Sequence, residues 1–434
     1  MSRPVRFTRR QFIQSATAAG FAGPLILTST TSLRAAPSDR INLGFIGVGT
    51  QGGGHVGGFL GRGDVQIVAI CDVVKNLREA HAKRVEERYA KNKKDGTYKG
   101  CKTYTDFREL LQHPGLDAVL IATPDHWHAI PCIEAAKAKK DIYCEKPLTH
   151  SIVQGRKIVE AVAQNKVIFQ TGSQQRSEFG GHFRKAVEYI RSGRIGKIKT
   201  IHIGDGVGDP PIACDLPDQP TPEGTDWEMW LGPAPKRGYH ADLCPTAVRR
   251  GFPVWRRYLE YSGGYLADMG AHHFDIAQWA LNMDNSGPVK IEPPKDQKAK
   301  RGLRFVYANG VEMIHAASGT PDCSFIGTDG IINATRGGIS SKPESILKEP
   351  LGDKDYHVYP SSNHHANWIE CIKSRKDTIC TAEIGHRSAT ICHLANIGYG
   401  LRRNLVWDPE KESFVHDDEA NKLVDHAMRE PWRL

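Results

Sequence analysis

The segment INLGFIGVGTQGGG, residues 41–54, decides the fold of the first half of the chain. It begins with a short apolar run of strand character and continues into the pattern G-x-G-x-x-G, formed by Gly47, Gly49 and Gly52. The first glycine of this pattern permits a tight turn. The second lets the backbone approach a pyrophosphate, and the third lets the next helix pack close to the strand. Free N–H groups at the start of that helix favour a phosphate. The segment therefore predicts a strand, a phosphate-binding turn and a helix.

A second signal follows at the next apolar run, residues 65–71, which ends at Asp72, 20 residues after Gly52. An acidic side chain at this place accepts hydrogen bonds from the ribose hydroxyls of a bound dinucleotide. The alternative is a glycine-rich turn with an unrelated aspartate at a strand end, but the combined context favours the dinucleotide. Asp72 would repel a 2′-phosphate, so we expect NAD rather than NADP.

Strand and helix patterns alternate up to residue 173, which predicts a doubly wound parallel sheet, an α/β Rossmann domain over 40–173. The expected strands after residue 72 are 117–122, 141–145 and 167–170, and the expected helices are 76–94, 106–112, 128–139 and 151–165. Functional residues of such sheets gather at the carboxyl ends of the strands. Thr123, Glu145, Lys146 and Gln174 lie at or just after such ends.

The pattern changes near residue 197, and we expect a second, α+β domain over 174–434. A strand at 197–204 precedes a proline-rich insertion, and turns at Asn309-Gly310 and Asp329-Gly330 separate what look like successive antiparallel strands. These strands are 303–307, 311–317 and 324–327, and helices are expected at 363–374 and 382–402. The final helices are candidates to pack back on the first domain.

Residues 1–36 resemble a twin-arginine signal, which predicts export to the periplasm. Arg9 and Arg10 precede Phe12, and a mild apolar stretch ends in small residues at Ala35 and Ala36. Glycine and proline interrupt the stretch, so no stable membrane span is expected.

The charge and the cysteine spacing argue against a nucleic-acid-binding, zinc-ribbon or disulfide-stabilised protein. The chain has 434 residues and a formal charge of +9, but residues 1–36 hold five arginines and no acid, which leaves 53 basic against 49 acidic residues. With no basic run interleaved with aromatics, no nucleic-acid partner is expected. The ten cysteines form no C-x-x-C pair, so neither a zinc ribbon nor a disulfide framework is predicted.

Two separate segments of the chain contain candidate catalytic residues. Lys146 follows a strand on the cofactor side, where a lysine can donate a hydrogen bond to a substrate hydroxyl; the alternative is a surface lysine at a turn. Asp268, His272 and Asp275 stand at i, i+4 and i+7 and share one face of a helix with an apolar setting. A carboxylate beside an imidazole makes an oriented base, although a buried structural pair would look the same. Further ligands are lacking, so no metal site is predicted.

Taken together, these motifs resemble the Gfo/Idh/MocA oxidoreductases, the group of glucose-fructose oxidoreductase and inositol dehydrogenase. The resemblance is carried by GVGTQG at 47–52, Asp72, ATPDHWH at 122–128, EKP at 145–147 and D-x-x-x-H-x-x-D at 268–275. It implies a Rossmann domain followed by an α+β domain with a large, mostly antiparallel sheet. That sheet often supports oligomers, so we expect a homo-oligomer, a dimer or tetramer.

The resemblance also implies site residues. The implied catalytic residues are Lys146, Asp268 and His272. The implied cofactor-binding residues are Gly47, Gly49, Thr50, Gln51, Gly52, Asp72, Thr123, Pro124, His128, Glu145 and Lys146. The implied substrate-binding residues are Gln174, Arg176, Asp268 and His272. Trp227 and Trp230 of the insertion either stack on a sugar or pack beneath a loop.

The reaction expected from this set is NAD-dependent oxidation of a secondary alcohol on a sugar, sugar derivative or cyclitol. His272 takes the hydroxyl proton, Asp268 orients His272, and Lys146 stabilises the alkoxide. Export would separate the protein from the cytoplasmic NAD pool, so a tightly bound, recycling NAD is expected. The alternatives are a redox-neutral glycosidase or lyase, with Tyr265 or His273 as a further base, and a non-catalytic sugar-binding protein.

Overall fold

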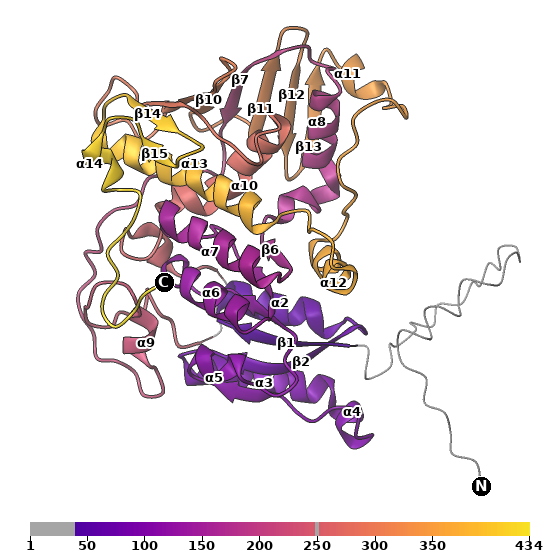
Figure 1. The fold of residues 1–434 in the computed structure, drawn as a ribbon, viewed down its shortest axis with the longest axis vertical. Coiled ribbons are helices and arrows are strands. Elements are labelled where there is room, and N and C mark those ends of the chain that lie inside the picture. The colour runs from indigo at the N-terminus through magenta and orange to yellow at the C-terminus, as the bar shows by residue number, and fades with distance from the viewer. Residues whose placement is uncertain (1–39, 248–250) are drawn as a thin grey trace, which may run out of the picture.

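The computed structural model describes residues 40–247 and 251–434, so the twin-arginine-like segment lies outside the described residues. Within the described part, the first domain holds a six-stranded, wholly parallel sheet (Figure 1). In spatial order its strands are β3 (Lys102–Tyr104), β2 (Val65–Cys71), β1 (Ile41–Ile46), β4 (Ala118–Ile121), β5 (Asp141–Cys144) and β6 (Phe169–Thr171). The expected doubly wound domain is thereby confirmed.

The helices that connect these strands mostly follow the expected ranges. They are α2 (Thr50–Leu60), α3 (Lys75–Arg88), α4 (Ala90–Lys94), α5 (Phe107–Leu111), the short η2 (Asp125–Trp127), α6 (Ala129–Lys137) and α7 (Ile152–Asn165). The expected single helix over 76–94 is broken at Tyr89, whose backbone leaves the helical region. Ser151 caps α7 as a good N-cap residue does, by accepting a hydrogen bond from the Gln154 N–H.

The strand order places the site. The chain runs outward from β1 to β3 on one side and then from β4 to β6 on the other, so β1 and β4 flank the topological switch point. The crevice beyond their carboxyl ends is where open parallel sheets bind ligands. The glycine turn follows β1 and Thr123 follows β4, so both lie at this crevice.

The second domain contains a nine-stranded, mostly antiparallel sheet within the described residues, as expected. In spatial order it comprises β13 (Gly338–Lys342), β12 (Ile331–Thr335), β11 (Cys323–Gly327), β7 (Ile198–Ile203), β10 (Glu312–His315), β9 (Arg304–Val306), β8 (Lys290–Glu292), β14 (Leu405–Asp408) and β15 (Ser413–Phe414). One detail of the prediction is wrong. β10 and β11 are not neighbours, because β7 lies between them and pairs with β10 in parallel.

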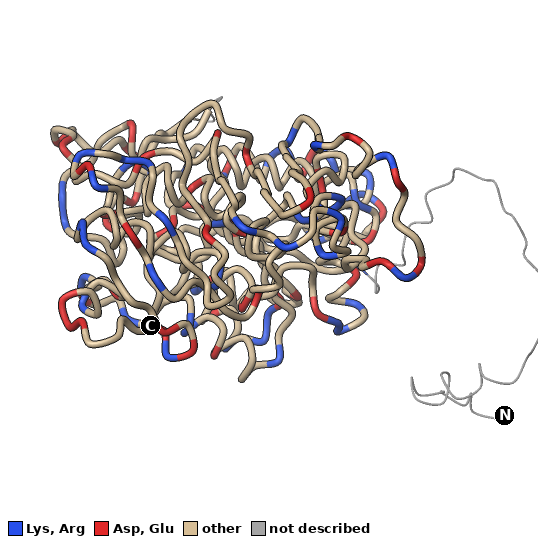
Figure 2. Tube along the Cα trace, turned by 90° about the horizontal axis from the view of Figure 1, so that it is seen from above, with Lys and Arg blue, Asp and Glu red and all other residues tan. Residues whose placement is uncertain are grey.

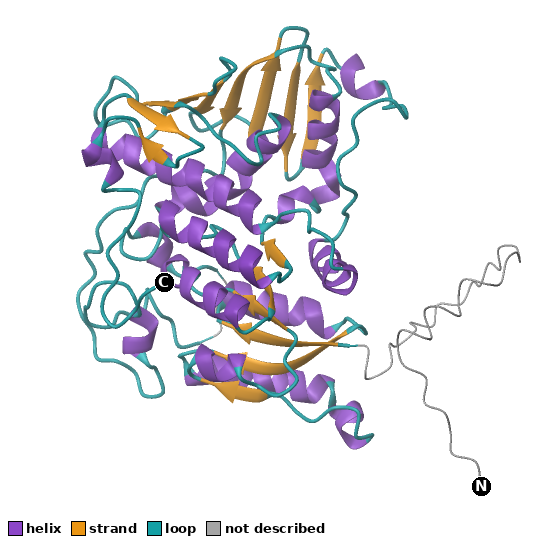
Figure 3. Ribbon diagram, in the orientation of Figure 1, coloured by secondary structure: helices purple, strands orange, loops and turns teal. Residues whose placement is uncertain are grey.

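The helices α10 (Gly264–Ala280) and α13 (Ala382–Leu401) lie between the two sheets (Figures 1 and 3). Fourteen residues of α10 are buried, among them His272, and α10 packs against α13. The helical segments of this domain are η3 (Gln174–Arg176), η4 (Phe179–Gly181), α8 (His182–Arg191), α9 (Trp227–Leu231), η5 (Val254–Arg257), α10 (Gly264–Ala280), α11 (Ser345–Lys348), α12 (His364–Ser374), α13 (Ala382–Leu401) and α14 (Asp418–Asn421).

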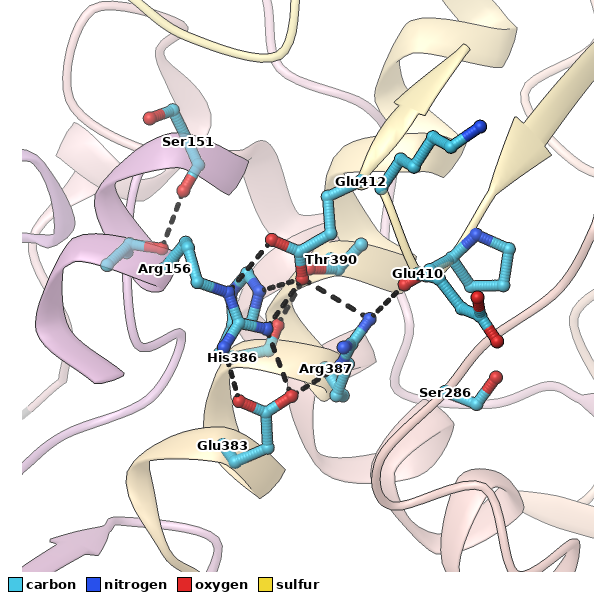
Figure 4. Close-up of polar contacts among 12 residues, drawn as sticks. Ser151, Arg156, Ser286, Glu383, His386, Arg387, Thr390, Glu410 and Glu412 are labelled. Atoms are coloured by element: carbon cyan, nitrogen blue, oxygen red, sulfur yellow. Dashed lines mark hydrogen bonds and ion pairs between the residues drawn. The ribbon is translucent and has the colours of Figure 1, made fainter. Parts of the chain in front are cut away.

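A partly buried ion network joins the two domains where α13 packs along α7 (Figure 4). Arg156 of α7 reaches Glu383 at 2.7 Å and Glu412 at 2.8 Å, and His386 also contacts Glu412. Burial raises the pKa of Glu412, but the hydrogen bonds from His386 and Arg156 lower it to about 2. The Glu412 carboxylate therefore stays ionised at neutral pH, and the pair of Arg156 with Glu383 links α13 to the first domain.

Lys and Arg positions are interspersed with Asp and Glu positions along the described backbone (Figure 2). No helix in 40–247 or 251–434 combines the length and apolar character needed to cross a bilayer. All ten cysteines are free thiols, and most are buried.

Candidate functional site

The glycine turn has the geometry that a diphosphate requires. Gly47 adopts φ +83°, and a Cβ there would lie 2.9 Å from the Ala122 carbonyl. A Cβ on Gly52 would lie 2.1 Å from the Gly47 oxygen, so any side chain would push α2 away from β1. A Cβ on Gly49 would meet nothing within 4 Å, which leaves open space above the backbone. The turn therefore fits the close approach of a phosphate at the start of α2.

Asp72 lies at the end of β2 and is held by backbone donors. One carboxylate oxygen accepts the Val48 N–H at 2.8 Å and the other accepts the Val74 N–H at 2.9 Å. Burial raises the pKa of Asp72, whereas these two hydrogen bonds lower it. Each carboxylate oxygen has a second lone pair, so both ribose hydroxyls can still donate to it.

A groove of about 1000 Å³, its open mouth included, runs from Asp72 past the glycine turn. The first domain forms its floor with Gly47, Gly49, Thr50, Gln51, Thr123 and Pro124. Residues 224–247 and 251–257 of the second domain, here named the roof segment, line the opposite wall with Trp230, Leu243, Cys244, Trp255 and Arg256 among others. The groove is therefore composed of both domains.

A second cavity, the catalytic cleft, continues from this groove. Its volume is about 1050 Å³ with its mouth, and it shares Gln51, Ala122, Thr123, Trp255 and Arg256 with the groove. The predicted residues that line it are Thr123, His128, Glu145, Lys146, Gln174, Asp268 and His272. The amine of Lys146 and the imidazole of His272, 126 positions apart in the chain, thus face one space.

Lys146 and Asp268 form an ion pair within the cleft. The lysine Nζ lies 2.7 Å from Asp268 Oδ1 and 2.8 Å from the Asp268 carbonyl oxygen. Burial raises the pKa of Asp268, but the charges of Lys146 and Arg256 outweigh it and the net shift is downward. The carboxylate therefore stays ionised and holds the ammonium at the cleft wall.

His272 is a neutral base in this setting. Burial, then the positive charges of Lys146 and Arg336, hold the pKa of His272 well below its usual range. Its Nδ1 is buried without a hydrogen-bond partner among the described residues. The expected contact from Asp268 to His272 is also absent from the described hydrogen bonds, because Asp268 binds Lys146. Asp268 therefore acts on the lysine and not on the imidazole.

Glu145 anchors a polar chain that sequence reasoning missed. Its Oε1 accepts hydrogen bonds from Gln174 at 2.8 Å and from His55 at 2.7 Å, and His55 in turn contacts His365 at 2.8 Å. Burial raises the pKa of Glu145, but the hydrogen bond and charge of His55 lower it to about 2. Glu145 thus fixes the strand end before Lys146. His55 lies three residues after Gly52, but nothing in the sequence indicates that it contacts Glu145 and His365, which are far away in the chain.

His128 contacts the backbone of two turns that border the cleft. Its Nδ1 lies 2.8 Å from the Pro147 oxygen and its Nε2 lies 2.9 Å from the Thr123 oxygen. The ring therefore connects the turn after β4 with the turn that carries Lys146.

Other candidates lie away from the cleft. Arg176 is 1% exposed and forms ion pairs with Asp275 at 2.8 Å and Asp284 at 2.7 Å, so its guanidinium serves the core and the geometry gives no support for a substrate contact. Asp275 is likewise a core residue, fully buried. Tyr265 and His273, the bases considered for a redox-neutral reaction, are not among the residues that line the cleft.

The tryptophans of the insertion pack under a loop. Trp227 and Trp230 stack on each other with centroids 4.7 Å apart, and both are nearly buried. Trp230 also lines the dinucleotide groove, whereas Trp227 lines neither cavity. In 40–247 and 251–434, no group of three or more His, Cys, Asp or Glu is arranged to hold a metal ion.

Comparison with protein families gives two matches. The model described as "Oxidoreductase family, NAD-binding Rossmann fold" matches residues 41–173, and the model described as "Oxidoreductase family, C-terminal alpha/beta domain" matches residues 212–434. Both models describe the Gfo/Idh/MocA group.

Individual relatives share between a quarter and a third of their residues with this chain over the matched regions. A myo-inositol 2-dehydrogenase of Thermotoga maritima is 27% identical over 241 residues, which cover 56% of this chain and 55% of the relative. A scyllo-inositol 2-dehydrogenase (NAD(+)) of Bacillus subtilis is 28% identical over 297 residues, which cover 63% of this chain and 72% of the relative. The chain spans about half the length of several curated relatives that it matches.

Among solved structures, a putative myo-inositol dehydrogenase from Sinorhizobium meliloti 1021 aligns with a TM-score of 0.54 and 19% identity. The alignment covers 84% of this chain and 99% of the chain in that structure. At this identity the likeness shows a shared fold.

Proposed function

Because the chain belongs to the Gfo/Idh/MocA oxidoreductase family, we propose that it oxidises a secondary alcohol of a cyclitol or sugar with a bound nicotinamide cofactor. The observation that carries this proposal is the convergence of Lys146, Asp268 and His272 in one cleft that continues into the dinucleotide groove. The inositol dehydrogenases among its relatives favour an inositol isomer as the substrate class.

The chain's own residues supply the acid–base chemistry. A bound nicotinamide would supply the acceptor for the hydride of the substrate carbon. His272, neutral because of its low pKa, takes the hydroxyl proton. The ammonium of Lys146 faces the same space and stabilises the negative charge that develops on the substrate oxygen. Asp268 holds that ammonium in place through the 2.7 Å contact.

We propose NAD as the cofactor, held tightly through repeated turnovers. Asp72 disfavours a 2′-phosphate, and the roof segment supports retention because it covers the groove opposite the glycine turn. Retention also suits the export that residues 1–36 predict, since NAD can then enter during folding, before transport. The homo-oligomeric state stays a prediction.

Native mass spectrometry of the untreated protein tests the cofactor, and a panel of inositol isomers, sugars and sugar acids then tests the substrate. We expect about one NAD per chain and reduction of the bound nicotinamide, seen by its absorbance, with at least one polyol. The control variant is Tyr265→Phe. Because Tyr265 is not among the residues that line the cleft, this variant should catalyse reduction of the bound cofactor as the wild type does. Protein that binds no dinucleotide even when NAD is added would refute the proposal.

A further inference from the structure

Arg256 stands at the junction between the dinucleotide groove and the catalytic cleft. It belongs to η5 in the roof segment, and it lines both cavities. The first domain contributes Gln51, Ala122 and Thr123 to the same junction. Nothing in the sequence around Arg256 marked it as a site residue, because its place depends on how the second domain folds over the first.

The guanidinium of Arg256 is rigidly held. It stacks over the rings of Trp255 at 4.2 Å and Phe252 at 4.6 Å, and its Nε lies 3.5 Å from Asp268 Oδ1. The side chain is only 13% exposed. An arginine held between rings loses little further freedom when it binds a ligand, because its planar fork is already oriented.

One end of the guanidinium has no hydrogen-bond partner within 40–247 and 251–434. Nη1 is buried and makes no hydrogen bond to any described residue. A buried donor left unpaired is costly, and more so on a charged group. Nη1 is therefore an unsatisfied donor on a side chain that lines the junction of the two cavities.

The position of the junction indicates which acceptor this is. Asp72, suited to the adenosine ribose, lies at one end of the continuous space, and Lys146 and His272 lie at the other. A dinucleotide that spans these ends must pass its pyrophosphate through the middle, beside the glycine turn. Guanidinium groups bind phosphate oxygens with charge-assisted, often paired hydrogen bonds.

We propose that Arg256 is a pyrophosphate ligand of the cofactor, donated by the second domain opposite the glycine turn. This inference rests on the proposed function. The roof segment is anchored at the same place, because Thr50 Oγ1 donates a 2.8 Å hydrogen bond to the Gly251 carbonyl at the start of α2. It is anchored again beside Asp72, where the Lys75 N–H donates to the Gly224 carbonyl at 2.8 Å. The two walls of the groove are thus joined beside the glycine turn, at the middle of the dinucleotide path, and beside Asp72, at its adenosine end.

Binding measurements with nucleotide fragments test this role directly. Affinities for NAD, ADP-ribose and adenosine are measured by calorimetry on the wild type and on Arg256→Gln, after any bound nucleotide has been quantified. NAD and ADP-ribose contain the pyrophosphate and should bind about 10- to 100-fold more weakly to the variant, since hydrogen bonds to charged groups are the stronger class. Adenosine, which lacks it, should bind both proteins equally.

Two further variants separate binding from folding. Arg256→Lys keeps the charge near Asp268 but loses the fork, and we expect an intermediate affinity for NAD with normal thermal unfolding. Arg257→Gln is the matched control, because Arg257 follows on the same short helix, is exposed and lines neither cavity. It should bind NAD as the wild type does.

Two results would overturn the inference. In the first, Arg256→Gln binds NAD like the wild type but needs far more polyol, which would make Arg256 a substrate residue. In the second, all three ligands weaken equally, which would make it a structural residue. A wild-type protein that binds neither NAD nor ADP-ribose would instead refute the proposed function itself.

Discussion

Removal of the Lys146 ammonium separates catalysis from stability in a measurable way. Lys146→Met keeps the apolar stem and deletes the group that contacts Asp268 at 2.7 and 2.8 Å. A preorganised donor to a developing oxyanion is worth roughly 10²- to 10³-fold in turnover, so we expect a loss of that size. NAD content should change little, because the groove is lined mainly by other residues.

The same variant should also unfold more easily. Loss of one partner of a fully buried pair costs about 3–5 kcal/mol, but the Lys146 and Asp268 side chains are 14% and 19% exposed. Arg256, 3.5 Å from Asp268, remains as a second cation. We therefore expect a loss of about 1–2 kcal/mol in the free energy of unfolding, below the value for full burial.

A double variant distinguishes the two effects. Lys146→Met with Asp268→Asn removes both charges, so stability should return toward the wild-type value while turnover stays low. Lys137→Met serves as the control, because Lys137 lies on the surface of α6 and pairs with Glu134 alone among the described residues. Turnover is followed by reduction of bound nicotinamide, and stability by denaturant unfolding. A single variant with turnover within about threefold of the wild type would refute the assigned role of Lys146.

Three further predictions concern charge. Arg336→Gln removes a cation that helps to keep the pKa of His272 low, so protonation should begin at higher pH and the acid limb of the kcat/KM profile should move upward; an unmoved limb would contradict this. Asp72→Asn should shift the ratio of NAD to NADP affinity toward NADP by roughly tenfold, measured by competition binding, and an unchanged ratio would count against the ribose contact. Stability should fall as pH drops from about 6.5 to about 4, because buried histidines stay neutral when folded and the unfolded chain binds more protons in that range. Burial is the main cause of these low values, with pKa about 4 for His126 and His364 and about 3 for His365 and His393. A melting temperature constant between those pH values would refute the argument.

The parts of the site that could be predicted are those encoded by local pattern. Gly47, Gly52 and Asp72 belong to one βαβ unit, whose turn and strand end follow from neighbouring residues. Glu145 and Lys146 follow a strand of the same parallel sheet, and parallel strands end on one edge. The sheet order therefore brings them to the cofactor crevice without any knowledge of side-chain contacts.

The remaining parts depend on contacts between distant segments. The partner of Asp268 turned out to be Lys146, 122 positions away, and not His272 on the next helical turn. Arg176 was expected in the pocket and Arg256 was not, yet Arg176 is neutralised by Asp275 and Asp284, whereas Arg256 has an Nη1 without a partner among the described residues. Composition and spacing do not show which guanidinium is fully paired, because the pairing depends on how the second domain packs.

The composite groove links cofactor binding to domain docking. The glycine turn and Asp72 come from the first domain, whereas Trp255 and Arg256 come from the second, so the complete groove exists only when both are folded and in contact. A ligand that binds only this docked state stabilises it by mass action. A dinucleotide bound across the junction would then strengthen the same contact that the ion network of Arg156 and the Thr50–Gly251 hydrogen bond already hold. The roof segment lines the wall opposite the turn, and its contacts with a bound dinucleotide support a cofactor that remains bound between turnovers.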